Sequence, residues 1–350
     1  MIQRLTMCFF QPARAARNVF LLACCLLGCL SCAPKKTAGR SVAVFIPGQL
    51  EGSAIYSQLA AGTARAVREQ PGARILIVEA GFNQAEWEAK LTALAAQGVH
   101  DLIVTSNPAM PYFVDAIRQR FPEQHFLLMD AEMADVPTVY SLRYNQREQA
   151  YMAGYLAALL SAADGSGDTR SIGLLAAQEY PAMTGIIRPA YLEGAAAAAA
   201  DEGRAALSLD YRVVGNWFDA QKAAELSRGM LQSGARVILT IAGSANEGAV
   251  QAAAESGAKV LWFDSNGYAV RPGVVAGSSA LMQEQAVYDK LKLYFENRLP
   301  FGTAETAGLE DGYVRFIDDD PLYIQTVAPE IREKQARMIE KIQSGGLVLD

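Results

Sequence analysis

Short apolar runs alternate with helix-length segments along most of this chain, and this alternation constrains the fold more than any other feature. Ser41–Ile46 and Asp101–Thr105 have the length and composition of buried strands, and helix-forming segments such as Ala85–Gln97 separate such runs. Neighbouring parallel strands need crossover connections of this kind, which are usually helices. The alternation therefore predicts an α/β protein whose parallel strands are covered by helices on both faces.

The alternation begins again after Asn145, although no sequence repeat is detectable. We therefore expect two similar doubly wound lobes joined by a hinge, with a ligand cleft between the carboxyl ends of both sheets. The last third of the chain has no complete unit of its own, so its pieces are expected to complete both sheets. The predicted first lobe contains residues 41–143 and about 267–300, and the second contains residues 144–266 and about 301–350.

The N-terminal residues form a separate unit. Arginines precede the apolar run Val19–Gly28, which is too short to span a membrane and is typical of an export signal. All five cysteines lie within the first 32 residues, which excludes a disulfide framework for the folded part. The run resembles a bacterial lipoprotein signal with the lipidated residue at Cys29 or Cys32, and a plain cleaved signal is the alternative. We expect a signal peptide at residues 1–31, a tether at 32–40, and a periplasmic protein anchored to a membrane by lipid.

Composition and residue placement argue against several classes of function. The net charge is −6 and no basic block follows the leader, so a nucleic-acid partner is not expected. His100 and His125 fall at the strand ends opposite the predicted cleft, so no catalytic triad and no transition-metal ligand set is expected. Asp130 and Asp264 both end strands on the cleft side, where two carboxyls could serve a hydrolase. Nothing supplies the rest of such an enzyme, so we expect neither catalysis nor a catalytic cofactor.

The residues at the predicted carboxyl strand ends are mostly aromatic or polar and neutral, without lysine. Such a set suits a flat, mostly uncharged ligand that forms hydrogen bonds. Tyr56 and Trp217 could stack on its two faces, and Asp130 and Asp264 could accept hydrogen bonds from it. The candidate ligand contacts are Tyr56, Phe82, Ser106, Asn107, Asp130, Asn145, Trp217, Gly243, Ser244, Asp264, Asn266 and Met282.

The loop at Gly215–Lys222 carries the most informative aromatic pair. A Trp and a Phe on a strand-to-helix loop form either a packing plug or one wall of a binding site. Tyr56 offers an opposite wall in the other lobe, which favours the binding site. We expect Trp217 to stack on the ligand, Phe218 to pack behind it, and Asp219 to cap the following helix.

Several segments resemble, in kind and order, the basic-membrane-protein family of lipoproteins, which are substrate-binding proteins of ABC importers and include purine nucleoside receptors. The resemblance covers residues 41 to about 346 and implies a type I periplasmic-binding-protein fold, a monomer, and partners in an inner-membrane permease and its ATPase. The nucleoside-binding members clamp the base between two aromatics and use strand-end acids, which match Tyr56, Trp217, Asp130 and Asp264. The matching segments are Phe126–Asp130, Tyr144–Gly154, Gly215–Lys222, Ile241–Ser244 and Gly308–Asp311.

Departures from the nucleoside-binding members suggest another ligand. This chain has Pro47 or a neighbour in place of an Asp, Ser57 in place of an Asn, and Met282 in place of a Lys. The sequence looks more like the riboflavin-binding members, in which an isoalloxazine ring would fill the aromatic clamp. A purine nucleoside receptor is the alternative, and a periplasmic enzyme or a sensor are further alternatives.

Overall fold

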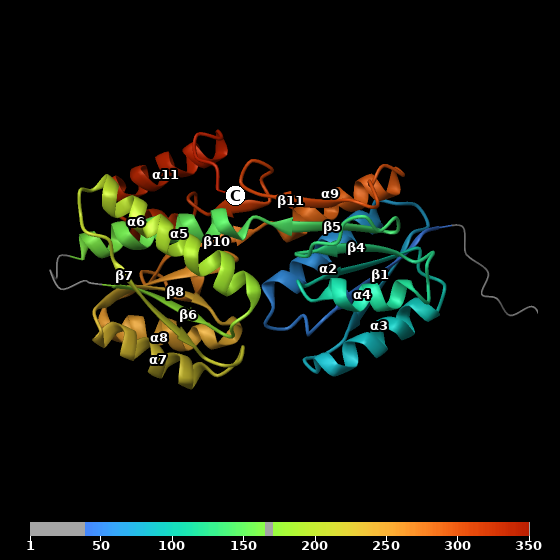
Figure 1. The fold of residues 1–350 in the computed structure, drawn as a ribbon, viewed down its shortest axis with the longest axis horizontal. Helices are drawn as coiled ribbons and strands as arrows, with labels where there is room; N and C mark the ends of the chain where they lie inside the picture. Colours follow the sequence, from blue (N-terminus) through green and yellow to red (C-terminus); the bar gives the residue numbers. More distant parts are fainter. Residues whose placement is uncertain (1–38, 165–170, 350) are drawn as a thin grey trace, which may run out of the picture. The chain divides into compact units, whose positions relative to one another are not determined.

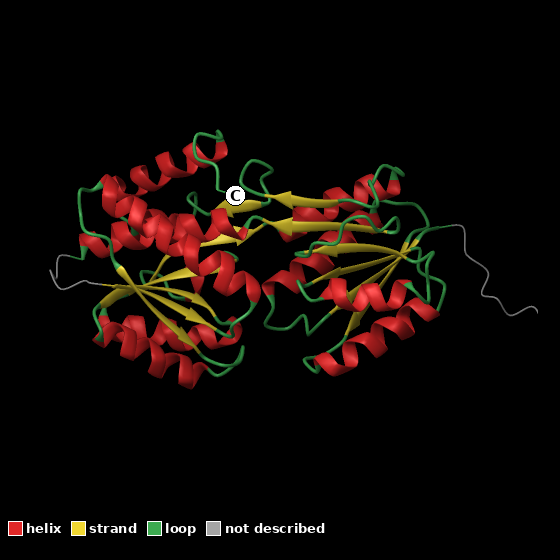
Figure 2. Cartoon of the chain, in the orientation of Figure 1, coloured by secondary structure: helices red, strands yellow, loops and turns green. Residues whose placement is uncertain are grey.

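The structure is a computed structural model and describes residues 39–164 and 171–349. The described residues form two α/β lobes, each built around a six-stranded sheet with helices on both faces (Figures 1 and 2). This confirms the predicted fold class. The predicted signal peptide, most of the tether, and Cys29 and Cys32 lie outside the described residues.

The first sheet has the strand order β11-β5-β4-β3-β1-β2, and all its neighbouring strands are parallel. In β1 (Ser41–Ile46), Val42, Val44 and Ile46 belong to one core cluster, whereas Ala43 and Phe45 belong to the other. Both faces of the strand are therefore buried, which explains its continuous apolar sequence. The strands are β1 (Ser41–Ile46), β2 (Arg74–Glu79), β3 (Leu102–Ser106), β4 (His125–Met129), β5 (Val139–Tyr144) and β11 (Ala304–Ala307).

The second sheet has the order β12-β10-β9-β8-β6-β7, in which only β12 is antiparallel to its neighbour. Position by position this order repeats that of the first sheet, so β4 and β9 occupy equivalent places. The strands are β6 (Ser171–Ala176), β7 (Ser208–Val213), β8 (Ala235–Ile241), β9 (Lys259–Asp264), β10 (Val275–Leu281) and β12 (Val314–Phe316).

Side chains at the helix starts define where several helices begin. Ser53, Asn145 and Asp219 each accept a hydrogen bond from a backbone N–H in the first turn of the next helix. The predicted capping role of Asp219 is therefore confirmed. The helices are α2 (Ala54–Arg68), α3 (Trp87–Ala96), α4 (Met110–Arg118), α5 (Gln146–Ala163), α6 (Arg188–Asp201), α7 (Ala220–Gln232), α8 (Asn246–Ser256), α9 (Gln283–Phe295), α10 (Pro321–Thr326) and α11 (Pro329–Gln343), with short helical turns η1 (Gln84–Glu86), η2 (Met183–Ile187), η3 (Gly243–Ala245) and η4 (Tyr268–Val270).

The last third of the chain divides between the lobes differently from the predicted boundaries. In the range predicted for the first lobe, 267–300, β10 pairs with β9 and belongs to the second lobe, whereas α9 packs against α2 of the first lobe. In the range predicted for the second lobe, 301–350, β11 pairs with β5 of the first sheet. The chain therefore passes between the lobes three times, after β5, between β10 and α9, and between β11 and β12.

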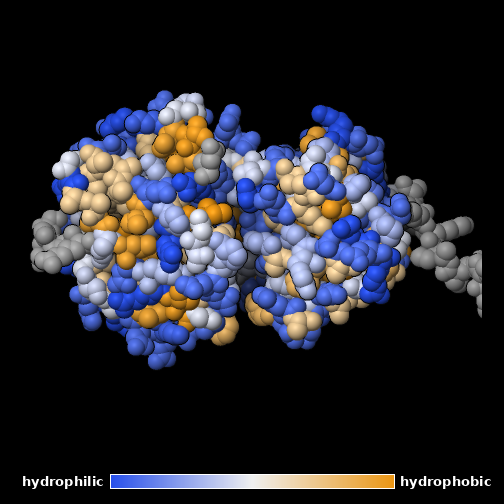
Figure 3. Space-filling view, in the orientation of Figure 1, coloured by the Kyte–Doolittle hydropathy of each residue, from blue (hydrophilic) through white to orange (hydrophobic). Residues whose placement is uncertain are grey.

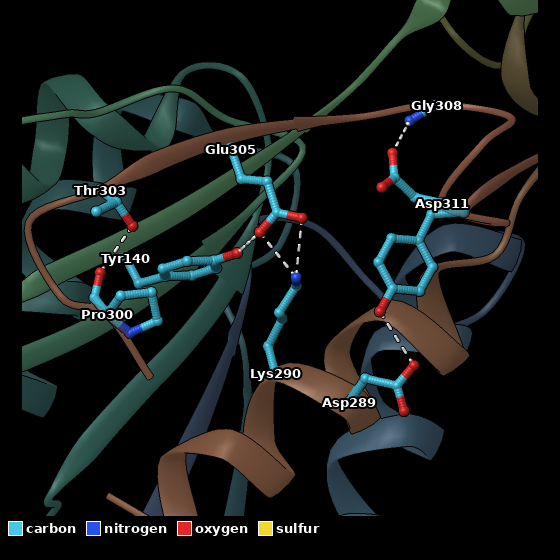
Figure 4. A network of polar contacts seen from close by, with 9 residues as sticks. Tyr140, Asp289, Lys290, Pro300, Thr303, Glu305, Gly308 and Asp311 are labelled. Atoms are coloured by element: carbon cyan, nitrogen blue, oxygen red, sulfur yellow. Dashed lines mark hydrogen bonds and ion pairs between the residues drawn. The ribbon is translucent and has the colours of Figure 1, made fainter. Parts of the chain in front are cut away.

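A network of polar contacts links β5, β11 and α9, the elements next to these crossings (Figure 4). Lys290 of α9 donates to both carboxylate oxygens of Glu305 on β11, at 3.0 and 2.8 Å, and Glu305 also accepts from the hydroxyl of Tyr140 on β5. Burial opposes ionisation of Glu305, but these bonds hold its pKa below the ordinary value. Tyr313, near the third crossing, donates to Asp289 of α9 at 3.0 Å. The network therefore joins β5, β11 and α9 beside the crossings.

The hydrophobic core consists of two clusters. The smaller one lies between the first sheet and helices α3 and α4, and includes Phe45, Trp87 and Val114. The larger one covers the other face of the first sheet and continues through the second lobe. On the face drawn in Figure 3, hydrophobic residues lie among hydrophilic ones on both lobes.

Candidate functional site

Two aspartates occupy equivalent places in the two lobes. Asp130 follows β4 and Asp264 ends β9, at the carboxyl ends of the strands. Both have left-handed backbone conformations, with φ of 50° for Asp130 and 69° for Asp264. Non-glycine residues adopt this region rarely, and when they do they often belong to functional sites. Each strand therefore ends in a turn that holds an aspartate in an uncommon orientation.

The two carboxyl groups are close enough for the charge of one to act on the other. Burial and then the charge of Asp264 raise the pKa of Asp130 to about 8, and burial raises the pKa of Asp264 to about 6. Both side chains nevertheless keep partial solvent access. Protein surrounds them on most sides while solvent still enters, which is the environment expected at the bottom of a cleft. Both carboxyl groups are therefore harder to ionise than an exposed aspartate, and Asp130 more so than Asp264.

Tyrosines from both lobes surround this pair. The pKa of Tyr180 is raised by burial and then by the charges of Asp264 and Asp130, and that of Tyr144 by burial and by Asp130, Tyr313 and Asp264. Tyr144 is buried and donates its hydroxyl to Gln283 at 3.3 Å, whereas Tyr180 is partly exposed. Tyr180 is therefore the tyrosine of this pair whose ring can reach a ligand.

The first lobe contributes Tyr56 in the first turn of α2. Its ring packs over Gly48, because a Cβ on that glycine would lie 2.9 Å from a ring carbon. Its hydroxyl accepts a hydrogen bond from Asn107 at 3.2 Å. Burial, opposed by this bond and assisted by the charge of Asp130, raises the pKa of Tyr56 to about 12. Tyr56, Asn107 and Asp130 therefore lie close together at the carboxyl edge of the first sheet.

The second lobe contributes Trp217. The backbone carbonyl of Trp217 accepts hydrogen bonds from the Ser244 hydroxyl at 3.2 Å and from the Ala245 N–H at 3.3 Å. Its ring lies 6.4 Å from that of Tyr180, tilted by 36°. These hydrogen bonds fix the backbone of Trp217, while its side chain remains 42% exposed. Its indole ring is therefore accessible from solvent.

The expectation that Phe218 packs behind Trp217 is wrong. Phe218 is 74% exposed, more than Trp217 itself. Asn216 accepts hydrogen bonds from the N–H groups of both Phe218 and Asp219, which turns the backbone so that the Phe218 ring points to solvent. Gly243 and Tyr180 instead lie against Trp217.

Three predicted ligand contacts have structural partners within the described chain. The buried Ser106 hydroxyl donates to Gln283 at 3.2 Å. Asn145 caps α5 through its carbonyl oxygen and donates to the Leu349 carbonyl at 3.4 Å. Asn266 donates to Asp320 at 2.8 Å and accepts from the Tyr268 N–H. Their polar atoms are already used, so a ligand role is not needed to explain these residues.

The remaining predicted contacts lie around the same strand ends. Ser244 and Gly243 support Trp217, and Gly243 has φ of 61°. Phe82 follows β2 and is 75% exposed, and the partly buried Met282 lies where the chain passes from β10 to α9. Within the part of the chain that the structure describes, no group of three or more His, Cys, Asp or Glu residues could hold a metal ion.

The sequence prediction did not include Gln149. This residue lies in the first turns of α5, is fully buried, and donates to Asp264 at 3.1 Å and to the Ser279 carbonyl at 3.2 Å. The sequence did contain a clue, because Gln149 is an amide within the mostly apolar segment Glu148–Ser161. A buried amide needs hydrogen-bond partners, so such a residue can point to a polar site.

Comparison with solved structures shows that ABC solute-binding proteins share this type I periplasmic-binding-protein fold. A solute-binding protein of an ABC transporter system from Aeropyrum pernix K1 superposes with a TM-score of 0.76 at 22% identity, covering 89% of this chain and 94% of that one. A solute-binding protein from Conexibacter woesei gives a TM-score of 0.64 at 20% identity, covering 89% and 99%. At these identities the likeness concerns the fold.

Residues 40–347 match the Bmp family, described as ABC transporter substrate-binding protein PnrA-like, and the chain belongs to this family. An uncharacterized lipoprotein of Pyrococcus horikoshii is 27% identical over 237 residues, which cover 66% of this chain and 57% of that protein. An uncharacterized lipoprotein of Pyrococcus abyssi is 26% identical over 237 residues, with the same coverage. The chain thus spans little more than half the length of the curated relatives it matches. Within the described residues, no helix is sufficiently long and apolar to span a membrane.

Proposed function

We propose that this protein is a lipid-anchored receptor that captures riboflavin between its lobes for an ABC importer. The observation that supports the proposal is that the charges of Asp130 and Asp264 act on aromatic residues of both lobes. Tyr56 supplies the wall in the first lobe, and Trp217 with Tyr180 supplies the wall in the second.

The chemistry of these residues suits a flat ring with polar edges. Stacking of a ring on an aromatic side chain contributes roughly 1–3 kcal/mol. Because the pKa of Asp130 is raised more than that of Asp264, the acid pair can offer a protonated donor and an ionised acceptor. An isoalloxazine ring has two large faces and an edge with both N–H and carbonyl groups, and the ribityl hydroxyls would bond to polar loops such as that at Asn107.

The transport role rests on family membership and on the leader sequence. Lipidation at Cys29 or Cys32 would hold the receptor at a membrane on the extracytoplasmic side. A ligand that contacts both lobes stabilises the closed arrangement relative to the open one. The closed receptor would then deliver its ligand to an inner-membrane permease driven by an ATPase, and we expect it to act as a monomer.

The test is a titration of the full-length protein, in detergent, with riboflavin. We expect quenched flavin fluorescence at a stoichiometry of one, and a yellow protein as isolated. A protein that ignores riboflavin but binds inosine would show that the ligand is a purine nucleoside. Recovery of the bound ligand chemically altered would contradict the receptor assignment and favour an enzyme that uses the two acids.

Replacing Gly243 by alanine is expected to weaken riboflavin binding by roughly tenfold, through partial loss of stacking. The new Cβ would lie 2.9 Å from the Trp217 carbonyl oxygen and 3.4 Å from Cβ and Cε3 of the same residue, so the indole must shift. The control is Gly257→Ala, at a glycine with a similar φ of 71° but with no atom within 4 Å of the new Cβ. Equal affinities for the two variants would show that the position of Trp217 does not matter.

A further inference from the structure

The two carboxyl groups of the acid pair differ in their hydrogen bonds. Asp264 accepts from Gln149 Nε2 at 3.1 Å. Among the described residues, none forms a hydrogen bond with the Asp130 carboxyl group, although Asp130 occupies the equivalent place in the other sheet. The two equivalent aspartates therefore differ in their hydrogen-bonding surroundings.

The orientation of the Gln149 amide is fixed by its surroundings. Its nitrogen lies within hydrogen-bond distance of two acceptors, the Asp264 carboxyl oxygen and the Ser279 carbonyl oxygen. If the amide were rotated, its oxygen would face both acceptors, which is unfavourable. The oxygen Oε1 points instead to a buried position without a partner. Gln149 can therefore only donate to Asp264, and a donor favours the ionised form of a carboxyl group.

We propose that Gln149 is a positioning residue that fixes Asp264 as the hydrogen-bond acceptor of the site and leaves Asp130 as its donor. The cleft would then select a ring that presents a donor to the second lobe and an acceptor to the first. This inference rests on the proposed function, because it assumes that the acid pair contacts the ligand. A cyclic amide or imide edge, in which an N–H lies next to a carbonyl, meets this requirement.

The pKa shifts of the two aspartates agree with an acceptor role for Asp264 and a donor role for Asp130. The pKa of Asp264 is raised by burial but lowered by the Gln149 bond, and reaches about 6, whereas that of Asp130 reaches about 8. The other titratable groups that face the pair are Tyr56, Tyr144 and Tyr180, and each has a raised pKa. These phenols stay neutral while the acids titrate, so a pH profile between 5 and 9 reports on the acids.

The first experiment needs no ligand. Carbon-13 NMR of the aspartate carboxyls follows their titration in the full-length protein in detergent. We expect Asp264 to ionise at lower pH than Asp130, and Gln149→Met to raise the midpoint of Asp264 towards that of Asp130. The control is Gln335→Met, which removes another fully buried amide that donates to a backbone carbonyl, that of Met152. An Asp264 midpoint that is unchanged in Gln149→Met would overturn the proposal.

The second experiment measures riboflavin affinity from pH 5 to 9. Affinity should fall below about pH 6, where Asp264 takes up a proton, and above about pH 8, where Asp130 loses the proton that it donates. Gln149→Met should weaken binding at pH 7 by about tenfold, while Gln335→Met should not. Asp130→Asn keeps an N–H donor at every pH, so the alkaline fall should disappear, and its persistence would overturn the proposal even if Gln149→Met fails to fold. If riboflavin does not bind at all, the proposed ligand is wrong, and the carboxyl titration still decides the role of Gln149.

Discussion

Replacing Trp217 by alanine is expected to weaken riboflavin binding by about 5- to 150-fold. The substitution removes the larger stacking surface of the second lobe, and stacking of one ring contributes roughly 1–3 kcal/mol, where about 1.4 kcal/mol is a factor of ten. Fluorescence titration at pH 7 measures the affinity. Thermal unfolding measures whether the fold is kept, and we expect little change there because the Trp217 side chain is 42% exposed.

The neighbouring Phe218 provides the matched control. It lies on the same loop and is 74% exposed, but it has no ring contact with Tyr180 comparable to that of Trp217 among the described residues. Phe218→Ala should therefore change the affinity by less than about twofold, as expected for an exposed side chain outside the contact. Full affinity in Trp217→Ala would show that this residue is only a packing plug. Equal losses in both variants would place the ligand at the outer rim of the loop.

The alternation of apolar runs and helices was enough to predict the two lobes, because buried parallel strands leave a continuous apolar signal. Residues Val42 to Ile46 show this, since successive side chains enter different core clusters. The distribution of the last third could not be predicted in the same way. β11 and β12 have only four and three residues, which is too short for a pattern, and tertiary pairing alone decides which sheet each strand joins.

Only the residues of the candidate site that follow clear strands could be proposed from the sequence. Asp130 and Asp264 follow clear strands, and the rule that ligands bind at carboxyl strand ends selects them without knowledge of contacts. Ser106 and Asn145 satisfy the same rule, but their partners Gln283 and Leu349 are 177 and 204 residues away in sequence. Gln149 precedes the site on a helix and reaches Asp264 across 115 residues. Such pairings depend on the folded packing, which local patterns do not encode.

Asp130→Asn is expected to stabilise the ligand-free protein at alkaline pH. The folded-state pKa of Asp130, about 8, lies above its ordinary value, so the folded state keeps a proton that the unfolded chain releases above about pH 4. Stability from this group is therefore fully present below pH 4 and is lost progressively as the pH rises to about 8. The amide cannot ionise, so the variant should not lose this stability. Asp264 contributes in the same direction up to about pH 6, in both proteins.

Thermal unfolding of the full-length protein between pH 4.5 and 8.5 measures the difference. Allowing for partial solvent access, we expect a gain of about 1–3 kcal/mol at pH 8.5, or roughly 2–4 °C in Tm for each kcal/mol, and almost none at pH 4.5. Asp135→Asn is the control, because Asp135 is exposed and has a left-handed backbone with φ of 61°. The same gain at both pH values would indicate a backbone effect instead of a buried charge. A gain confined to alkaline pH, together with altered ligand binding, would show that this acid is kept for recognition at the expense of stability, as functional residues often are.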